Sequence, residues 1–100
     1  MKIALVIFDQ FTDLDLFLMW DLFNRVRLPN WQVSIVGERP QHISTTGMTV
    51  QTHERLEAAN TADVVLFVSG QGTRAKMNEP ELCARFQLDP QRQMFGSICS

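Results

Sequence analysis

Two continuous apolar runs, residues 3–8 and 64–68, constrain the fold of this chain more than any other feature. Both contain β-branched residues and neither alternates with polar residues, so each predicts a strand that is apolar on both faces. Strands of this kind are typical of parallel sheets covered by helices on each side. A third, shorter run at residues 33–36 is bounded by Gly37 and Pro40. These runs predict an α/β fold with a mainly parallel sheet.

The segments between the runs predict helices and one small hairpin. Residues 14–26 form an unusually apolar helical stretch, which ends before Pro29 because proline disfavours helical geometry at the preceding residue. Residues 43–52 carry Gly47 at their middle and alternate apolar with polar residues, as a hairpin does. The remaining expected elements are a helical turn at 55–59, a short helix at 80–86 and a strand at 94–98.

The chain ends soon after the strand expected at residues 94–98. A strand in a parallel sheet needs a crossover helix to cover one of its faces, so we expect part of the domain to be missing after Ser100. No repeat, low-complexity tract or linker divides the chain internally. We therefore expect residues 1–100 to be the N-terminal part of a single domain.

Composition and charge exclude several classes of protein. A hydrophobic content of 45% with 20% charged residues is typical of a globular domain. The net charge of -2 gives no basic field, so we expect no direct nucleic-acid binding. Asp9 and Gln10 interrupt the apolar N-terminus long before the ~18 residues of a membrane span, and no cleavage site follows, so we expect no membrane association.

Cysteine usage points to a reducing compartment. Cys83 and Cys99 form no Cys-x-x-Cys pair and no framework of short spacings. Neither a disulfide scaffold nor a zinc site is therefore expected, and a cytoplasmic location fits best. We expect no metal and no cofactor.

Cys99 is the candidate nucleophile, because it directly follows the last expected strand. The small residues Gly96 and Ser97 precede it closely and Ser100 follows it. A sharp strand-to-helix turn here would expose the sulfur and direct a helix N-terminus at it, which favours the thiolate. The alternative is that Cys99 is a small buried hydrophobe, as cysteines often are.

Asp15 is the second candidate, since on a helical wheel it falls beside Met19, Leu22 and Val26 on the apolar side of the first helix. A carboxyl group there could hold or deliver a proton near a thiolate. Alternatively, Asp15 is an acid near a helix N-terminus, where the macrodipole favours it. Asp13 is the natural capping residue and leaves Asp15 free for another role.

A glycine-rich turn at residues 69–73 follows the second apolar run. Ligands bind outside the carboxyl ends of strands in open α/β sheets, and backbone amides in such a turn can face a developing negative charge. Gly70 and Gln71 are therefore candidate binding residues. The alternative is a tight turn without chemistry, because the lysine and further glycines of a phosphate-binding loop are absent.

Other conspicuous residues receive structural interpretations. His42 and His53 lie in polar segments and are expected to be solvated at the surface. Cys83 lies between Leu82 and Ala84 and is expected to serve packing. The large apolar residues of the first helix are expected to form core or a dimer face: Phe17, Met19, Trp20 and Phe23.

Four segments together resemble the ThiJ/PfpI superfamily, the relatives of class I glutamine amidotransferase domains: IALVIFDQFTDLDL, STTGMTVQTH, ADVVLFVSGQG and FGSICS. The resemblance covers essentially the whole chain and is greatest to the branch that contains isonitrile hydratase and the amidase-like domains of AraC-type regulators. It implies a flavodoxin-like three-layer sandwich, of which only the N-terminal half is present. It also implies a homodimer.

The resemblance further implies roles for five residues. Cys99 would be the nucleophile on an elbow, with Asp15 as the acid that points at it. The amide of Ser100 would help to form the oxyanion site, and Gly70 and Gln71 would contribute from the turn.

The sequence departs from the family pattern at two places beside this expected pocket. Ser69 and Gln71 replace the proline and second glycine of the family's Pro-Gly-Gly turn. Residues 17–19 stand where the branch often has a Gly-Pro pair.

The first functional hypothesis is a cysteine-dependent small-molecule enzyme resembling isonitrile hydratase. Cys99 would attack an electrophilic carbon, Asp15 would manage the proton, and water would release the product. The first alternative is a metabolite-sensing, amidase-like domain of a transcription regulator, with a separate helix-turn-helix domain. The second is a redox-sensing or protective protein in which Cys99 is oxidised.

Overall fold

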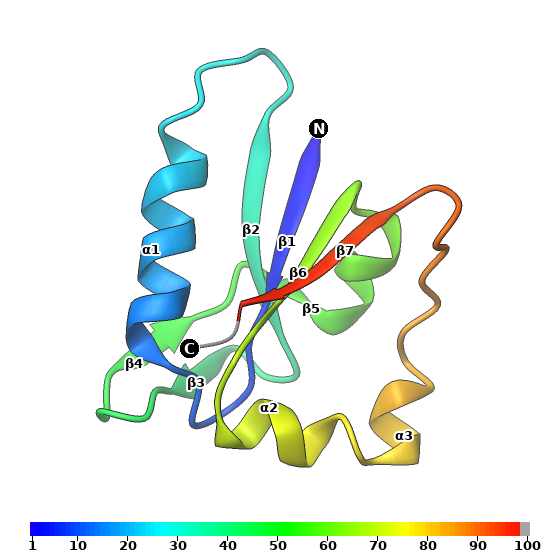
Figure 1. Ribbon diagram of the computed structural model, residues 1–100. Helices are drawn as coiled ribbons and strands as arrows, with labels where there is room; N and C mark the ends of the chain where they lie inside the picture. The colour runs from blue at the N-terminus through cyan, green and yellow to red at the C-terminus, as the bar shows by residue number, and fades with distance from the viewer. Residues whose placement is uncertain (99–100) are drawn as a thin grey trace.

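Residues 1–98, which the computed structural model describes, alternate between strands and helices (Figure 1). The strands are β1 (Lys2–Val6), β2 (Gln32–Gly37), β3 (Gln41–Ile43), β4 (Thr49–Gln51), β5 (Glu54–Arg55), β6 (Val64–Val68) and β7 (Met94–Ile98). The helices are α1 (Asp13–Asn24), the 3-10 helix η1 (Leu56–Thr61), α2 (Gln71–Lys76) and α3 (Pro80–Cys83). Within the described residues, no helix combines the length and hydropathy that crossing a bilayer requires.

The central sheet has five strands in the order β5-β2-β1-β6-β7, and every neighbouring pair is parallel. The α/β class and the mainly parallel sheet predicted from the apolar runs are therefore confirmed. The predicted hairpin is also present, as the antiparallel pair β3 and β4. Gly47 lies between these strands with a φ of +94°, a conformation that glycine adopts most easily.

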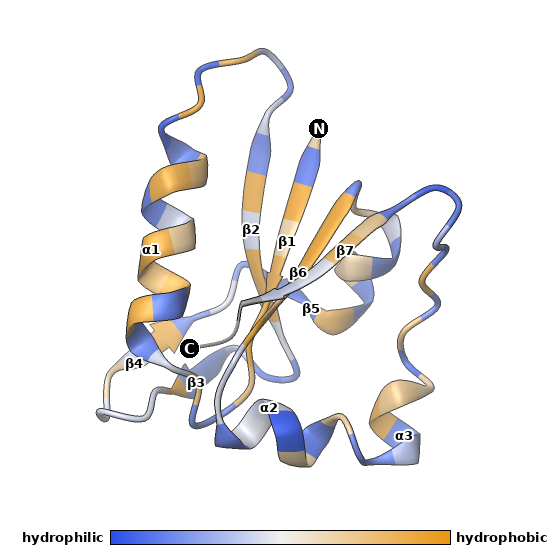
Figure 2. Ribbon diagram, in the orientation of Figure 1, coloured by the Kyte–Doolittle hydropathy of each residue, from blue (hydrophilic) through white to orange (hydrophobic). Residues whose placement is uncertain are grey.

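Strand β1 contributes to two separate cores, one on each face of the sheet. Ala4 and Val6 pack in one core with Leu56 of η1 and Leu82 of α3. Ile3 and Leu5 pack in the other core with Leu16 of α1. Figure 1 shows α1 and η1 on opposite sides of the sheet, and Figure 2 shows the apolar strands between them. The arrangement has the three layers of the predicted sandwich.

Helix α1 is only partly covered. Met19, Trp20 and Phe23 pack against the core, as predicted, whereas Phe17 on the same helix is 36% exposed. The helix also leaves apolar side chains on its outer side: Leu14, Leu18 and Leu22. The inner side of α1 is therefore part of the core, and its outer side faces solvent in the single chain.

The start of α1 differs from the prediction. Thr12, not Asp13, is the N-cap residue, and no side chain caps the helix. The Asp13 carboxylate instead accepts hydrogen bonds of 2.6 Å from the hydroxyls of Ser44 and Thr46. These bonds, with that from Ser44 the larger contribution, lower the pKa of Asp13. Asp13 therefore fastens the hairpin loop to α1, and its assignment as a cap is wrong.

The segment after β6 also differs. The sequence predicts one helix at residues 80–86 and none before it, but α2 begins directly after Gly70 and α3 ends at Cys83. Glycines at both sides of Gln71 disfavour helix by propensity. Tertiary packing overrides that preference, because the turn and α2 lie directly against the chain after β1.

His42 is buried, so the expectation of a solvated surface histidine is wrong for this residue. Its Nδ1 lies 2.9 Å from Oδ1 of Asp9, and its Nε2 accepts a hydrogen bond from the Arg39 amide at 3.3 Å. Because Nε2 is the acceptor, Nδ1 carries the proton of the neutral ring. Burial, only partly offset by Asp9, lowers the pKa of His42. His53 is exposed as predicted, although its ring stacks on Trp20.

This burial predicts a loss of stability as pH falls below about 6.5, the ordinary pKa of histidine. The pKa of His42 is lowered in the folded state, so the unfolded chain takes up the proton first in that window. Urea denaturation at pH 7, 6 and 5 should show the free energy of unfolding falling with pH, with a shallower slope in His42→Gln. Equal slopes in the two proteins, or an NMR titration of His42 at or above pH 6.5, would contradict the prediction.

Candidate active site

The candidate site lies at the edge of the sheet where the carboxyl ends of its parallel strands meet. Val6 of β1 pairs with Phe67 of β6, and Val68 at the end of β6 pairs with Ile98 at the end of β7. This register brings the turn after β6 beside the end of β7. Cys99 and Ser100 follow Ile98 in the sequence and lie outside the described residues.

Asp15 reaches this edge from the first turn of α1. Its residue exposure is 7%, and Oδ2 accepts a hydrogen bond of 2.6 Å from the hydroxyl of Ser69. A buried carboxyl group is costly unless it is hydrogen-bonded, and Ser69 supplies that partner across 54 residues of sequence. The structure therefore joins Asp15 to the turn after β6, next to the strand that leads to residue 99.

Phe11 holds these segments together. Its side chain is fully buried, and its backbone forms isolated bridges with Ser44 of the hairpin and Gly70 of the turn. The Thr12 amide, one residue later, donates to the Ser69 carbonyl at 2.9 Å. The chain between β1 and α1 thus fixes the start of α1 relative to the turn, and with it the position of Asp15.

Both glycines of the turn are required by close packing. Gly70 has a φ of +152°, and a Cβ atom there would meet the Gln10 carbonyl oxygen and lie 2.8 Å from the Phe11 Cα. A Cβ atom on Gly72 would collide with the Asp9 carbonyl oxygen. The turn at residues 69–73 is therefore tight, which is the geometry that the alternative without chemistry also predicts. Gln71 between the glycines is exposed.

Of the five site residues predicted from the sequence, the structure places three at this edge: Asp15, Gly70 and Gln71. Sequence reasoning missed Ser69 as the partner of Asp15. The signal was present, since Ser69 replaces the proline of the family turn and a hydroxyl can donate where proline cannot. Among residues 1–98, no group of three or more His, Cys, Asp or Glu side chains is placed to hold a metal ion.

Cys83, the cysteine that the structure does describe, lies apart from this site. Its residue is partly buried, and its Sγ donates to the Met77 carbonyl oxygen at 3.2 Å. The thiol therefore links α3 to the segment after α2. This agrees with the packing role expected from the sequence.

Several solved structures that resemble this one are DJ-1 or ThiJ/PfpI proteins. They include a C103A mutant of a DJ-1 superfamily protein from Salmonella typhimurium, with a TM-score of 0.81 and 18% identity. A ThiJ/PfpI family protein from Pseudomonas syringae has a TM-score of 0.81 at 20% sequence identity. The oxidized DJ-1 of Toxoplasma gondii has a TM-score of 0.78 at 15% identity. Each comparison covers 98–99% of this chain.

The chain has the DJ-1/ThiJ/PfpI fold. It spans 55%, 42% and 55% of the lengths of those three structures. No family model matches the sequence, and no curated protein is similar to it. The resemblance predicted from the four sequence segments is thus confirmed at the level of the DJ-1/ThiJ/PfpI fold.

Proposed function

We propose that the protein is a cysteine-dependent small-molecule enzyme of the isonitrile hydratase type, with Cys99 as nucleophile and Asp15 as its acid. The observation that carries this proposal is the buried Asp15–Ser69 pair beside the end of β7. Cys99 directly follows Ile98, the last residue of β7, in the sequence. A buried acid beside a candidate nucleophile is the pattern of a catalytic pair.

In this reaction Asp15 would pass one proton to the substrate carbon, and a proton would later return to the thiol. The sulfur of Cys99 would bond to the terminal carbon of the isonitrile, and that carbon would gain a proton through Asp15, which gives a thioimidate. Water would then add across the carbon–nitrogen double bond, its oxygen to the same carbon and one proton to the nitrogen. The carbon–sulfur bond would break as the hydroxyl becomes the carbonyl, and the hydroxyl proton would return to the thiol. The sum is isonitrile plus water to an N-substituted formamide. Amides of Gly70, Gln71 and Ser100 would stabilise negative charge in the tetrahedral intermediate.

A redox role is the second candidate. One solved structure with this fold is an oxidized DJ-1, which favours a thiol that reacts with oxidants. Peroxide titration followed by intact-mass measurement distinguishes the two. Stoichiometric addition of oxygen atoms at Cys99, without turnover of an electrophile, would favour the redox role.

The Asp15 assignment predicts a change in the reactivity of Cys99 toward iodoacetamide. In a Cys83→Ala background, Asp15→Ala should raise the pH midpoint of Cys99 alkylation by about one unit, because the variant lacks the carboxyl group that the proposal assigns as the acid beside the sulfur. Ser69→Ala should produce a smaller shift in the same direction, since the Asp15 carboxyl group would lose the hydrogen bond that orients it at this edge of the sheet. Intact-mass spectrometry at a series of pH values measures the rates.

Asp21→Ala is the matched control, because Asp21 is an acid on the same helix that pairs with Arg25 at the surface. It should leave the alkylation profile unchanged. An unchanged profile in Asp15→Ala would remove Asp15 from the site. A lowered midpoint would mean that Asp15 acts on the sulfur as a negative charge and not as a proton donor.

A further inference from the structure

A cavity of about 510 Å³ lies at the carboxyl ends of β2 and β5. Three segments line it: the turn at residues 37–40, residues 52–55, and Arg85 from the segment after α3. Its size falls in the range of small-molecule sites, roughly 300–1,000 Å³. It occupies the same edge of the sheet as Asp15, on the other side of β1, and shares no residue with the candidate active site.

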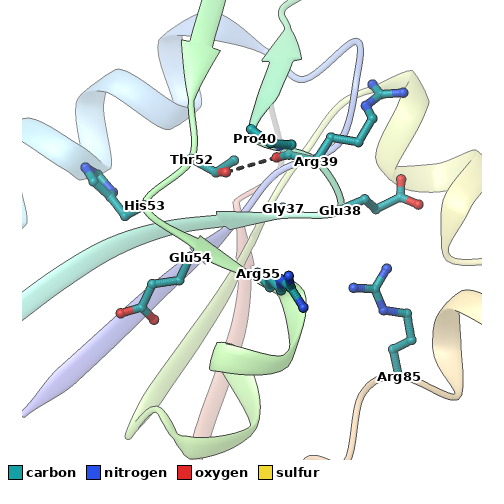
Figure 3. Close-up of a pocket in the computed structure, with 9 residues that line it drawn as sticks. All are labelled: Gly37, Glu38, Arg39, Pro40, Thr52, His53, Glu54, Arg55 and Arg85. Atoms are coloured by element: carbon teal, nitrogen blue, oxygen red, sulfur yellow. Dashed lines mark hydrogen bonds between the residues drawn. The ribbon is translucent and has the colours of Figure 1, made fainter.

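Arginines dominate the charge at this cavity. Figure 3 shows Arg85 extending toward Arg55 and Glu38, whereas Glu54 and His53 are directed away. Two of the acids are already paired, Glu54 with Lys2 at 3.2 Å and Glu38 with Lys76 at 3.4 Å. The third arginine, Arg39, pairs with Asp9.

Arg55 and Arg85 differ in how they are held. Arg85 donates through Nε and Nη2 to both carboxylate oxygens of Glu57, each at 2.8 Å, and this bidentate pair fixes its guanidinium. Arg55 forms no ion pair or side-chain hydrogen bond within residues 1–98, although, together with the hydrogen bonds from Arg85, its charge contributes to lowering the pKa of Glu57. One cation is therefore fixed and the other is unpaired among the described residues, and both line the same cavity.

We infer that this cavity binds a small oxyanion, a carboxylate or phosphate group held by Arg55 with help from Arg85. A guanidinium presents a planar fork of donors that matches such groups.

This site is independent of the proposed function. It requires neither Cys99 nor Asp15, so its failure would leave the enzyme proposal unchanged. A ligand here would be either an effector or a second metabolite, recognised by its anionic group.

The test is a titration of the intact, ¹⁵N-labelled protein, followed by NMR at constant ionic strength. One arm uses inorganic phosphate, a second uses succinate, and a third uses neutral succinamide. We expect saturable shifts at residues 37–40, 52–55 and 85 in at least one of the anion arms, and none with succinamide. The stronger anion arm identifies whether phosphate or carboxylate is the better ligand.

The decisive variant is Arg55→Gln, which removes the unpaired cation without breaking a hydrogen bond or ion pair among the described residues. It should raise the dissociation constant at least tenfold. Arg27→Gln, an exposed arginine outside the cavity, is the control and should change it less than twofold. Shifts that do not saturate, that spread over surface arginines, or that persist in Arg55→Gln would overturn the inference.

Discussion

Replacing Gly70 by alanine is expected to lower the free energy of unfolding by about 3 kcal/mol or more. Two effects combine at this position. The φ of +152° is strained for any residue with a side chain, and the added Cβ would press on the Gln10 carbonyl oxygen and the Phe11 Cα. Both neighbours are backbone atoms, so no side-chain rotation can relieve the contact. The turn would have to separate from the segment that positions Asp15.

Gly47→Ala is the matched control for this prediction. Gly47 also has a positive φ, +94°, but no atom lies within 4 Å of the position that a Cβ atom would occupy there. Its substitution should therefore cost only the backbone strain, about 1–2 kcal/mol. Urea denaturation of both variants measures the difference. Equal losses at the two positions would show that close packing at Gly70 is not the cause.

Replacing Cys99 by serine is expected to abolish turnover, with a fall in kcat/KM of at least about 10³-fold. A serine hydroxyl is far less ionised than a thiol at neutral pH, and in this site only Asp15 is proposed to assist it. The assay follows the formation of N-substituted formamide from an alkyl isonitrile. The fold should be intact, because the change replaces one sulfur atom by oxygen.

Cys83→Ser provides the control, since Cys83 donates to a backbone carbonyl away from the site. It should retain activity within about twofold. Activity of Cys99→Ser at the level of the unmodified protein, on any substrate that the protein turns over, would refute the nucleophile assignment. Loss of activity in Cys83→Ser but not in Cys99→Ser would place the functional thiol at Cys83.

The sequence predicts the central strands correctly because apolar residues lie on both of their faces. Residues 3–8 and 64–68 are apolar without interruption, and both runs contain strands of the central sheet. The hairpin follows from Gly47, whose positive φ matches the turn predicted there. In these segments the local sequence pattern and the tertiary environment favour the same structure, so the pattern alone is sufficient to predict it.

The features that the sequence does not predict depend on partners far away in the chain. His42 lies in a polar segment, yet it is buried because Asp9, 33 residues earlier, engages its ring. Helix α2 forms despite its glycines because Gly72 packs on the backbone at Asp9. The partner of Asp15 is likewise 54 residues away. Hydrophobic periodicity contains no information about such pairs.

The alternation along β1 has a consequence for how this protein tolerates change. Leu5 and Val6 are adjacent in sequence but belong to different cores. Their side chains therefore have no core neighbours in common. A loss of volume at Leu5 can be compensated within its own core, for example from Leu16 of α1, and one at Val6 within the other core, for example from Leu56 of η1. Substitutions should therefore accumulate in two uncorrelated groups, with the sheet as the boundary between them.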